Sequence, residues 1–428
     1  MLEILPLKGI LYNAKKVEDL SRVIAPPHDV ISPEVREALR SRSKFNFTRL
    51  DSPDGRADRY RRAAGLFRAW EERQVLVQDR EASIYVYGQT YRAQNREHTR
   101  TGFISLLKLE PLGQGVLPHE KVLEKGLRDR ISLIAATKAN FGVPLLLYAD
   151  RERVIDDILK KEVAPMAPCL EFVDGDGTRH RLWRVSRPGV IRKIRQEMRG
   201  HRCVIADGHH RYTSELRVKE ALGTESAKYG LMCFVNAFDE GTTILPTNRV
   251  VSGLPLDMGD FVRKLRRHFA VEEVEKLDLL VNRVRDALLT NRKTGRRRPV
   301  FGAYSNASSK GYLLKLKASA HSEGDLPRHP QNARVSDVNI LHEMIIERIL
   351  GITEEQQKKG EHIDFIKGDA ETIQKVLTSN AQLAFFVNPP TVEEVFRVAK
   401  SGETMPPKST FFYPKVFSGL VIYKMEEA

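Results

Sequence analysis

The chain has 428 residues, of which 41% are hydrophobic and 29% charged, and these proportions exclude a disordered chain. At about 100–200 residues per domain, the length predicts two or three folded domains. Lysine and arginine (70) exceed aspartate and glutamate (56), so the net charge is +14, which favours partners that carry phosphate or other negative charge. Three scattered cysteines exclude a disulfide framework, and no apolar run approaches the roughly 18 residues of a membrane span, so we expect a cytoplasmic protein without a membrane segment.

The first third of the chain predicts short strands alternating with helices. Ser32 followed by Pro33 is typical of a helix start, because serine caps the first N–H groups and proline suits the first helical position. The expected elements are a strand within 2–11, a turn at 26–29, helices over 33–40 and 57–73, and paired strands over 82–91 and 100–109. Residues 111–129 are charged and without a periodic pattern, which predicts a long and functional loop.

The remaining elements continue this alternation. They are helices over 131–138, 151–162, 189–199, 212–221, 260–269, 338–350 and 392–401, strands over 143–148, 202–206, 229–238, 299–304 and 382–387, and a hairpin within 171–183. A Ser-Gly-Leu-Pro stretch near residue 253 suggests a boundary. We therefore predict a first domain over 1–253 and a C-terminal α/β region over 254–428, whose terminal strand packs back on the first domain.

The sequence DGHHR follows a predicted strand and precedes a predicted helix. A strand that delivers a glycine-containing loop to a helix N-terminus is a geometry that binds phosphate, since N–H groups and the helix dipole attract anions. Gly208 would allow close approach, His209 and His210 could donate hydrogen bonds, and Arg211 could form a bidentate contact. Asp207 could support Mg²⁺ or bind a substrate hydroxyl. The alternative is a capping aspartate followed by surface histidines, and the motif alone leaves both open.

A second polar segment lies in the long charged loop. Glu120 could accept a hydroxyl proton while His119 orients it, and Lys121, Arg128 or Arg130 could neutralise a transferred phosphate or a substrate carboxylate. A solvated loop of mixed charge is the alternative. These residues are our candidates for the acceptor half of a phosphotransfer site.

The C-terminal tail gathers two lysines and two hydroxyls around an aromatic strand. Lys408, Ser409, Thr410 and Lys415 could line an anion site, although no GxxxxGK loop precedes them, and a structural edge strand is an equal alternative. The basic segments 263–267 and 292–298 could contact nucleic acid, but they lack interleaved aromatics and a helix-turn-helix pattern, which favours a solvated basic surface.

The DGHHR loop after an apolar strand resembles the signature of the ParB/sulfiredoxin-like superfamily, which includes chromosome-partition nucleotide hydrolases, sulfiredoxin and free serine kinases. The doubled histidine is most similar to the free serine kinases. Nearly the whole chain also resembles a large bacterial family known only as a domain of unknown function, through the segments IAPPHDVIS, HEK…RDR, ADGHHRYTS, LPTNRVV, QLAFFVNPPT and MPPKSTFFYPK. His28 and Asn248 depart from that family, which usually has tyrosine and histidine there.

The superfamily resemblance implies that the DGHHR loop lies against nucleotide phosphates. Gly208, His209, His210 and Arg211 would then contact phosphate, and Asp207 would be a polar or Mg²⁺-supporting residue. The family resemblance covers the segments that hold Asn13, Asp29 and Arg249, which are otherwise turn or cap residues, and makes them weaker site candidates.

These observations lead to one fold and several functions. The predicted fold is α+β, with a ParB/sulfiredoxin-like core that carries insertions, plus the second α/β region. The leading function is a nucleotide-dependent kinase that uses Mg²⁺ with ATP or ADP and phosphorylates a small hydroxylated metabolite, such as free serine or a related hydroxy acid. A nucleotide-switched DNA-binding regulator, a nucleotide hydrolase or nuclease, and a noncatalytic metabolite sensor stay open as alternatives. The sequence does not predict an oligomeric state.

Overall fold

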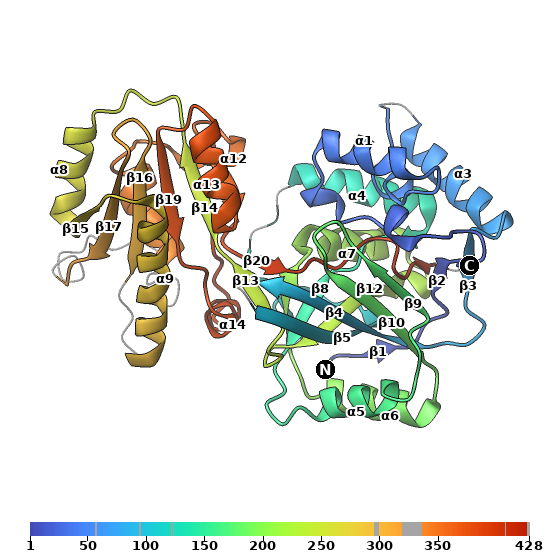
Figure 1. Cartoon of the computed structure of the whole chain (residues 1–428). Helices are drawn as coiled ribbons and strands as arrows, with labels where there is room; N and C mark the ends of the chain where they lie inside the picture. The colour runs from blue at the N-terminus through green and yellow to red at the C-terminus, as the bar shows by residue number, and fades with distance from the viewer. Residues whose placement is uncertain are drawn as a thin grey trace. The chain divides into compact units, whose positions relative to one another are not determined.

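The computed structural model describes residues 1–55, 58–93, 96–120, 122, 124–294, 299–318, 336–406 and 408–425. Its fold is α+β, as predicted, and the chain forms two compact units (Figure 1). The first unit comprises Met1–Pro118, Val122–Thr243 and Pro414–Ala428, and the second comprises His119–Lys121 and Ile244–Tyr413. The domain boundary predicted near residue 253 stays a prediction, because compactness does not by itself define an independently folding domain.

The first unit is built on a mixed sheet. The strand order is β6-β11-β8-β12-β5-β4-β10-β9, with β1 added on β5. The bounds are β1 Ile4–Leu5, β4 Ile84–Ala93, β5 Arg96–Lys108, β6 Val116–Leu117, β8 Leu145–Tyr148, β9 Leu170–Val173, β10 Arg179–Val185, β11 Cys203–Asp207 and β12 Tyr229–Asn236. Two smaller pairs join β2 (Ile10–Tyr12) to β3 (Leu76–Gln78) and β7 (Ala139–Asn140) to β21 (Tyr423–Lys424). The sheet therefore pairs strands from widely separated parts of the sequence.

Helices cover both faces of this sheet. Figure 1 shows α5 (Val154–Val163) and α6 (Pro188–Met198) on one face and α3 (Arg59–Glu72), α4 (Glu124–Thr137) and α7 (His209–Leu222) on the other. The remaining helices are α1 Pro33–Arg42, α2 Thr48–Asp51 and the short 3-10 helices η1 Leu20–Arg22, η2 His28–Val30 and η3 Ser226–Lys228. Apolar residues of α5 and α6, such as Ile155 and Ile194, pack with Phe103 and Phe234 of the sheet, so the main core lies between this helix pair and the sheet.

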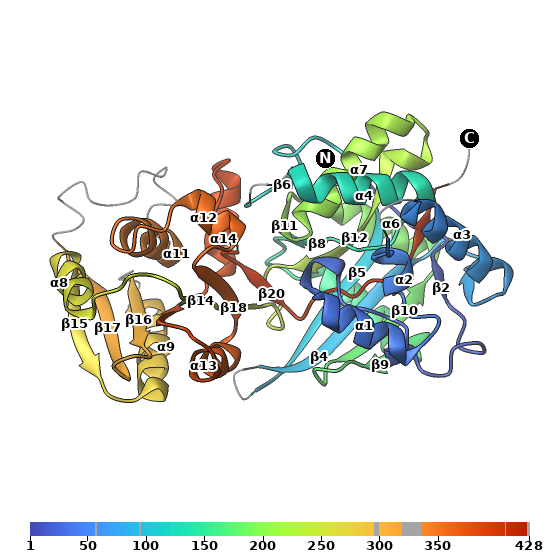
Figure 2. The ribbon, with the colours of Figure 1, turned by 90° about the horizontal axis from the view of Figure 1, so that it is seen from above.

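The second unit has a sheet of its own, in the order β15-β17-β16-β19-β14-β18, and a separate pair of β13 with β20. Its elements are β13 Thr243–Leu245, β14 Thr247–Val251, α8 Met258–His268, β15 Phe269–Val274, α9 Leu277–Thr294, β16 Val300–Ser305, β17 Lys310–Leu316, α11 Asp337–Ile340, the π-helix η4 Leu341–Glu347, α12 Glu354–Lys359, β18 Ile363–Lys367, α13 Asp369–Thr378, β19 Leu383–Val387, α14 Val392–Lys400 and β20 Phe411–Tyr413. Figure 2 shows α8 and α11 on one face and α9 and α13 on the other, and each face has its own apolar core.

Local signals placed most elements correctly, and the exceptions have physical causes. The predicted strand over 2–11 is broken into β1 and β2 around Pro6, which has no N–H to donate. The helix expected at 131–138 begins at Glu124, because its charged first turns consist largely of good helix formers. The helix expected over 338–350 is a short α-helix that continues as a π-helix. Ser32 caps α1 as predicted, accepting a hydrogen bond from the Val35 N–H.

Candidate functional site

The DGHHR segment forms a tight turn between β11 and α7. Gly208 has φ = 92°, and a Cβ there would lie 3.0 Å from the Arg211 side chain and 3.1 Å from Pro144 Cα, so only glycine fits without strain. The Tyr212 N–H already donates to the Gly208 carbonyl (3.0 Å), so α7 begins at His209 and not at Tyr212 as predicted. His209 to Arg211 therefore form the first helical turn, where the helix dipole attracts anions.

Asp207 is the centre of a buried ion-pair cluster. One of its carboxylate oxygens accepts a hydrogen bond from Arg211 Nη2 and the other accepts one from Lys415 Nζ. Burial alone would raise the pKa of Asp207, but Lys415 and Arg211 hold that pKa far below its usual range. Arg211 Nη1 also donates to the Val143 carbonyl at 2.9 Å. Asp207 thus holds two cations at the start of α7, the buried Arg211 and the largely buried Lys415.

Asp29 faces the same cations from η2. Desolvation raises the pKa of its carboxyl, whereas the charges of Arg211 and Lys415 lower it, and the net pKa is below the usual range. Asp29 as a whole residue is exposed. Neighbouring His28 is kept neutral, because burial and the charge of Arg130 lower its pKa. A second, accessible carboxylate therefore lies in the field of the Arg211 and Lys415 cations.

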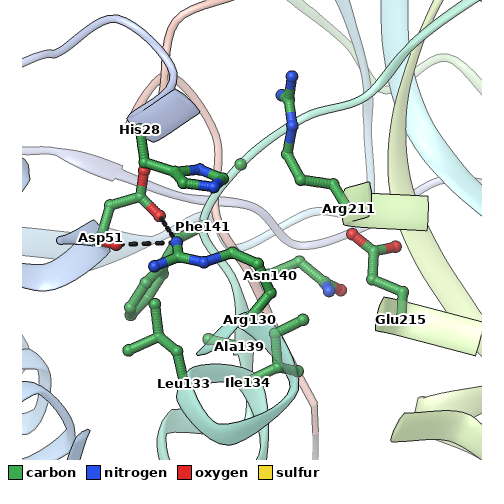
Figure 3. Close-up of a pocket in the computed structure, with 11 residues that line it drawn as sticks. His28, Asp51, Arg130, Leu133, Ile134, Ala139, Asn140, Phe141, Arg211 and Glu215 are labelled. Atoms are coloured by element: carbon green, nitrogen blue, oxygen red, sulfur yellow. Dashed lines mark hydrogen bonds and ion pairs between the residues drawn. The ribbon is translucent and has the colours of Figure 1, made fainter. Parts of the chain in front are cut away.

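A small polar pocket adjoins this cluster within the first unit (Figure 3). Its volume is about 20 Å³, enough for roughly one water-sized group. The lining residues are His28, Asp51, Arg130, Leu133, Ile134, Ala139, Asn140, Phe141, Gly142, Arg211 and Glu215. Figure 3 shows the Glu215 carboxyl and the Asn140 amide pointing toward the same space, while the Arg211 guanidinium points away from it.

Several polar atoms at this pocket have no hydrogen-bond partner. These are both amide atoms of Asn140, Oε2 of Glu215 and Nε of Arg211, all of them buried. Burial raises the pKa of Glu215 well above its usual range, and the Arg211 charge offsets this only in part. An unsatisfied buried polar atom costs about 1–3 kcal/mol, so such a concentration indicates a place where water or a ligand group completes the bonds.

Arg130, one of the predicted acceptor residues, lines the pocket, but its guanidinium is already paired. Nη1 donates to an Asp51 carboxylate oxygen at 2.8 Å, and Nε donates to Asp129 at 2.9 Å. This buried bridge joins α2 to α4 and fixes one wall of the pocket. Arg128, one helical position away from Asp129, is exposed on α4 instead of lying in a loop.

The other predicted acceptor residues belong to the second unit. His119 is buried, its Nε2 lies 2.9 Å from Thr410 Oγ1, and its carbonyl accepts the Met405 N–H at 2.8 Å. Glu120 forms a parallel bridge with Met405. The structure thus brings the HEK segment together with Thr410 of the tail, whereas Lys121 lies outside the described residues. The pairing of Glu120 with the phosphate loop stays a prediction.

The two other tail candidates have local roles. Ser409 is buried, and its hydroxyl donates to the Pro406 carbonyl at 2.6 Å. Lys408 is exposed and has φ = 61°. Neither arrangement by itself indicates an anion site.

Arg249 lies in the core of the second unit. Its Nε donates to His342 Nε2 at 3.0 Å, and its guanidinium carbon lies 5.3 Å from the centroid of the Phe365 ring. Burial lowers the pKa of Arg249 to about 9, and burial with the Arg249 charge lowers the pKa of His342 to about 3. Asn248, where the resembled family usually has histidine, donates to Asp369 Oδ1 at 2.9 Å. Both residues are buried and have their hydrogen-bond partners within the second unit.

The basic segments give no support to nucleic-acid binding. Arg263 and Lys264 of α8 both pair with Asp260 on the same helix. Residues 292–294 end α9, and residues 295–298 of the other basic run lie outside the described residues.

Sequence reasoning missed two pocket residues and ranked two others low. Asn140 and Glu215 stand in segments without a recognisable motif, and only the folded chain places them together. Asp29 was a turn residue by default and Lys415 a tail lysine, although both interact with Asp207 or Arg211. The sequence feature that could have indicated Asp29 as a site residue was its position directly after Pro26-Pro27-His28.

A magnesium ion fits this site only in part. Both carboxylate oxygens of Asp207 already accept bonds from cations, so Asp207 is a poor direct ligand. Among the described residues, no group of three or more His, Cys, Asp or Glu side chains could hold a metal. Mg²⁺ is usually held by one or two carboxylates together with substrate phosphates, and Asp29 is suited to supply one carboxylate.

Comparison with known proteins gives a family and several distant structures. The family model described as "Protein of unknown function (DUF1015)" matches residues 4–339. No curated protein matches the chain. In the part of the chain that the structure describes, none of the helices is long and apolar enough to cross a membrane.

The solved structures that match are remote in sequence. A free serine kinase in complex with AMP is 15% identical, with a TM-score of 0.35, covering 73% of this chain and 88% of its own. A conserved hypothetical protein from Pyrococcus furiosus is 16% identical, with a TM-score of 0.33 and coverages of 72% and 92%. SbnI with a C-terminal truncation from Staphylococcus aureus is 12% identical, with a TM-score of 0.34 and coverages of 72% and 83%.

Proposed function

Because the chain belongs to the family described as "Protein of unknown function (DUF1015)", whose description assigns no activity, we propose a function from the site itself. The protein is a nucleotide-dependent phosphotransferase that acts on a small hydroxylated metabolite. The observation that supports this most is the pair of cations, buried Arg211 and largely buried Lys415, that Asp207 binds at the N-terminus of α7. Phosphoryl transfer needs mainly positioning and charge neutralisation, and this arrangement supplies both.

The donor nucleotide would place its phosphates against the first turn of α7. N–H groups in the first turn of a helix favour a bound phosphate, and Gly208 would allow the backbone to approach it closely. Arg211 Nε is buried without a partner and is available for a phosphate oxygen after a small side-chain movement. ATP and ADP are both compatible with this arrangement, and Mg²⁺ bound mainly by the phosphates would neutralise their charge.

The acceptor hydroxyl requires a carboxylate that can take its proton. Asp29 is suited to this role because it is accessible, ionised and close enough to interact with Arg211 and Lys415. Glu120 is the second candidate, from the motif in the charged segment. Comparing Asp29→Asn with Glu120→Gln separates them, since loss of the general base should lower turnover by about 10²–10⁴-fold in only one variant.

The polar pocket beside Arg211 is suited to the acceptor. It offers the Asn140 amide and the Glu215 carboxyl, with hydrogen bonds still to be made, to a group about the size of a hydroxyl. This limits the group that enters the pocket to roughly one heavy atom. Free serine and related hydroxy acids belong to the class that we propose.

The experiment is a turnover assay with a panel of acceptors. The protein is incubated with Mg²⁺, ATP or ADP, and hydroxy amino acids or hydroxy acids, and products are followed by ³¹P NMR. We expect a new phosphate monoester with one class of acceptor, which Arg211→Gln abolishes and Arg217→Gln, an exposed arginine on the same helix, leaves unchanged. No nucleotide consumption and no phosphorylated product across the panel would refute the proposal.

A further inference from the structure

A groove in the first unit, lined by residues of α1, α2, the following loop and α3, is separate from the phosphate loop. Its volume is about 520 Å³, within the range of ligand sites. The lining residues are Arg40, Arg49, Pro53, Asp54, Arg62, Ala63, Gly65, Leu66 and Ala69. Three arginines against a single aspartate give the groove a net charge of +2, counted over these residues.

Arg49 is the least satisfied of these cations. Its Nη2 donates one hydrogen bond to the Arg40 carbonyl at 3.2 Å, its Nε is buried without a partner, and within the described ranges it contacts no carboxylate. A half-buried guanidinium normally pairs with an acid, because desolvating an isolated charge is costly. The groove therefore lacks one counter-charge that a bound anion would supply.

Arg40 lies deeper and already has two acidic contacts, because its Nη1 lies 3.4 Å from the Glu37 carboxylate and also pairs with Asp54. Its side chain is only 5% exposed, and its Nη1 pairs with Asp54 while Nη2 donates to the Ser52 carbonyl at 2.6 Å. Its Nε is buried without a partner. Arg62 Nη2 donates to the Asp54 carbonyl at 2.6 Å. Backbone carbonyls thus hold all three guanidiniums in place, those of Ser52 and Asp54 for Arg40 and Arg62 and that of Arg40 for Arg49, a preorganised arrangement for binding an oxyanion.

The opposite wall of the groove is apolar and has open space. It consists of Ala63, Gly65, Leu66 and Ala69 on α3, and a Cβ built on Gly65 would meet no atom within 4 Å. Two adjacent surfaces, one cationic and one apolar, suit a ligand that has both characters. A bare inorganic anion would leave the apolar wall uncovered.

We propose that this groove is a second binding site, for a small molecule that carries a phosphate or carboxylate group on an apolar body. The oxyanion lies between Arg40 and Arg49, and the apolar body lies against α3 at Gly65. This site is independent of the proposed phosphotransfer, because none of its lining residues belongs to the Asp207 cluster or to the polar pocket.

The test uses ¹⁹F NMR line broadening with 4-fluorophenyl phosphate and 4-fluorobenzoate as probes, and with the neutral 4-fluorophenol as the control compound. We expect at least one anionic probe to bind the full chain and the phenol not to bind. Arg49→Gln should weaken that binding about tenfold, the effect of losing one charge-assisted hydrogen bond. The two anions distinguish a phosphate site from a carboxylate site.

Substitutions at Gly65 separate binding from folding. Gly65→Ala and Gly65→Phe both remove a helix-weakening glycine from α3, but only phenylalanine fills the groove. We expect Gly65→Ala to bind the probe within about threefold of the wild type and Gly65→Phe to lose binding. Equal binding by the wild type, Gly65→Phe and Arg49→Gln would overturn the proposal, as would no binding of either anion to the wild type. Neither result depends on whether the protein transfers phosphate.

Discussion

Replacing Glu215 by glutamine should change how the stability of the protein depends on pH. The carboxyl is 3% exposed, and burial raises its pKa well above the value of 4.5 for an exposed glutamate, partly offset by Arg211. The folded chain therefore holds this proton more tightly than the unfolded chain. Its contribution to stability is complete below pH 4.5 and is lost as the pH rises toward the folded pKa, at about 1.4 kcal/mol per pH unit.

Glutamine cannot ionise, so Glu215→Gln removes this loss. The free energy of unfolding of the variant, minus that of the wild type, should increase between pH 5 and pH 7 by up to about 2.7 kcal/mol. Urea denaturation at several pH values, followed by circular dichroism, measures this difference. Glu220→Gln, on the exposed face of the same helix, is the matched control and should give a curve parallel to the wild type. A parallel curve for Glu215→Gln as well would refute the reasoning.

Three further substitutions probe the buried charges and the turn. Lys415→Met removes a cation that lowers the pKa of Asp207, so it should lower the free energy of unfolding at pH 7 by about 1.5–3 kcal/mol. The loss should be smaller at pH 3, because protonation of the Asp207 carboxyl in the unfolded chain has already reduced this contribution. Equal losses at both pH values would contradict this reasoning. Gly208→Ala should cost at least about 1–2 kcal/mol in urea denaturation, because φ is 92°, whereas Gly175→Ala, with open space around it, should change stability by under about 0.5 kcal/mol. Arg249→Met should leave the free energy of unfolding within about 1 kcal/mol of the wild-type value or raise it, because no described carboxylate pairs with this buried guanidinium. A loss above about 2 kcal/mol in thermal denaturation would argue against this.

The sequence predicted what depends on neighbours along the chain. The start of α1 follows from Ser32 and Pro33, whose capping hydrogen bond and fixed φ act within one turn. The strands β4 and β5 follow from the period-two alternation. In contrast, the predicted start of α7 was late by three residues, because the conformation of Gly208 decides where the helix begins and a glycine in a sequence does not specify its φ.

The candidate site depended on contacts between distant segments, and these were only partly predictable. The DGHHR motif identified Asp207 and Arg211, since both lie in one short stretch. Lys415 is 208 residues from Asp207, and no local pattern indicates that its ammonium group would reach that carboxylate. Glu215 shares the helix of Arg211, but a glutamate in a polar helix is usually exposed, and only the tertiary packing buries it.

The surplus of positive charge illustrates why composition cannot locate a binding site. Two cations of the first unit, Arg211 and Lys415, share one aspartate and are held for a ligand that the proposed function requires. Arg49 contacts no acid among the described residues and suggests a different ligand. Arg263 belongs to a dense basic run, yet its side chain is 66% exposed, so water solvates the charge and no ligand is needed. A cation indicates a binding site where the fold buries it beside fewer acidic groups than basic ones. The balance of charge in each buried cluster is therefore a better guide to a binding site than the density of basic residues in the sequence.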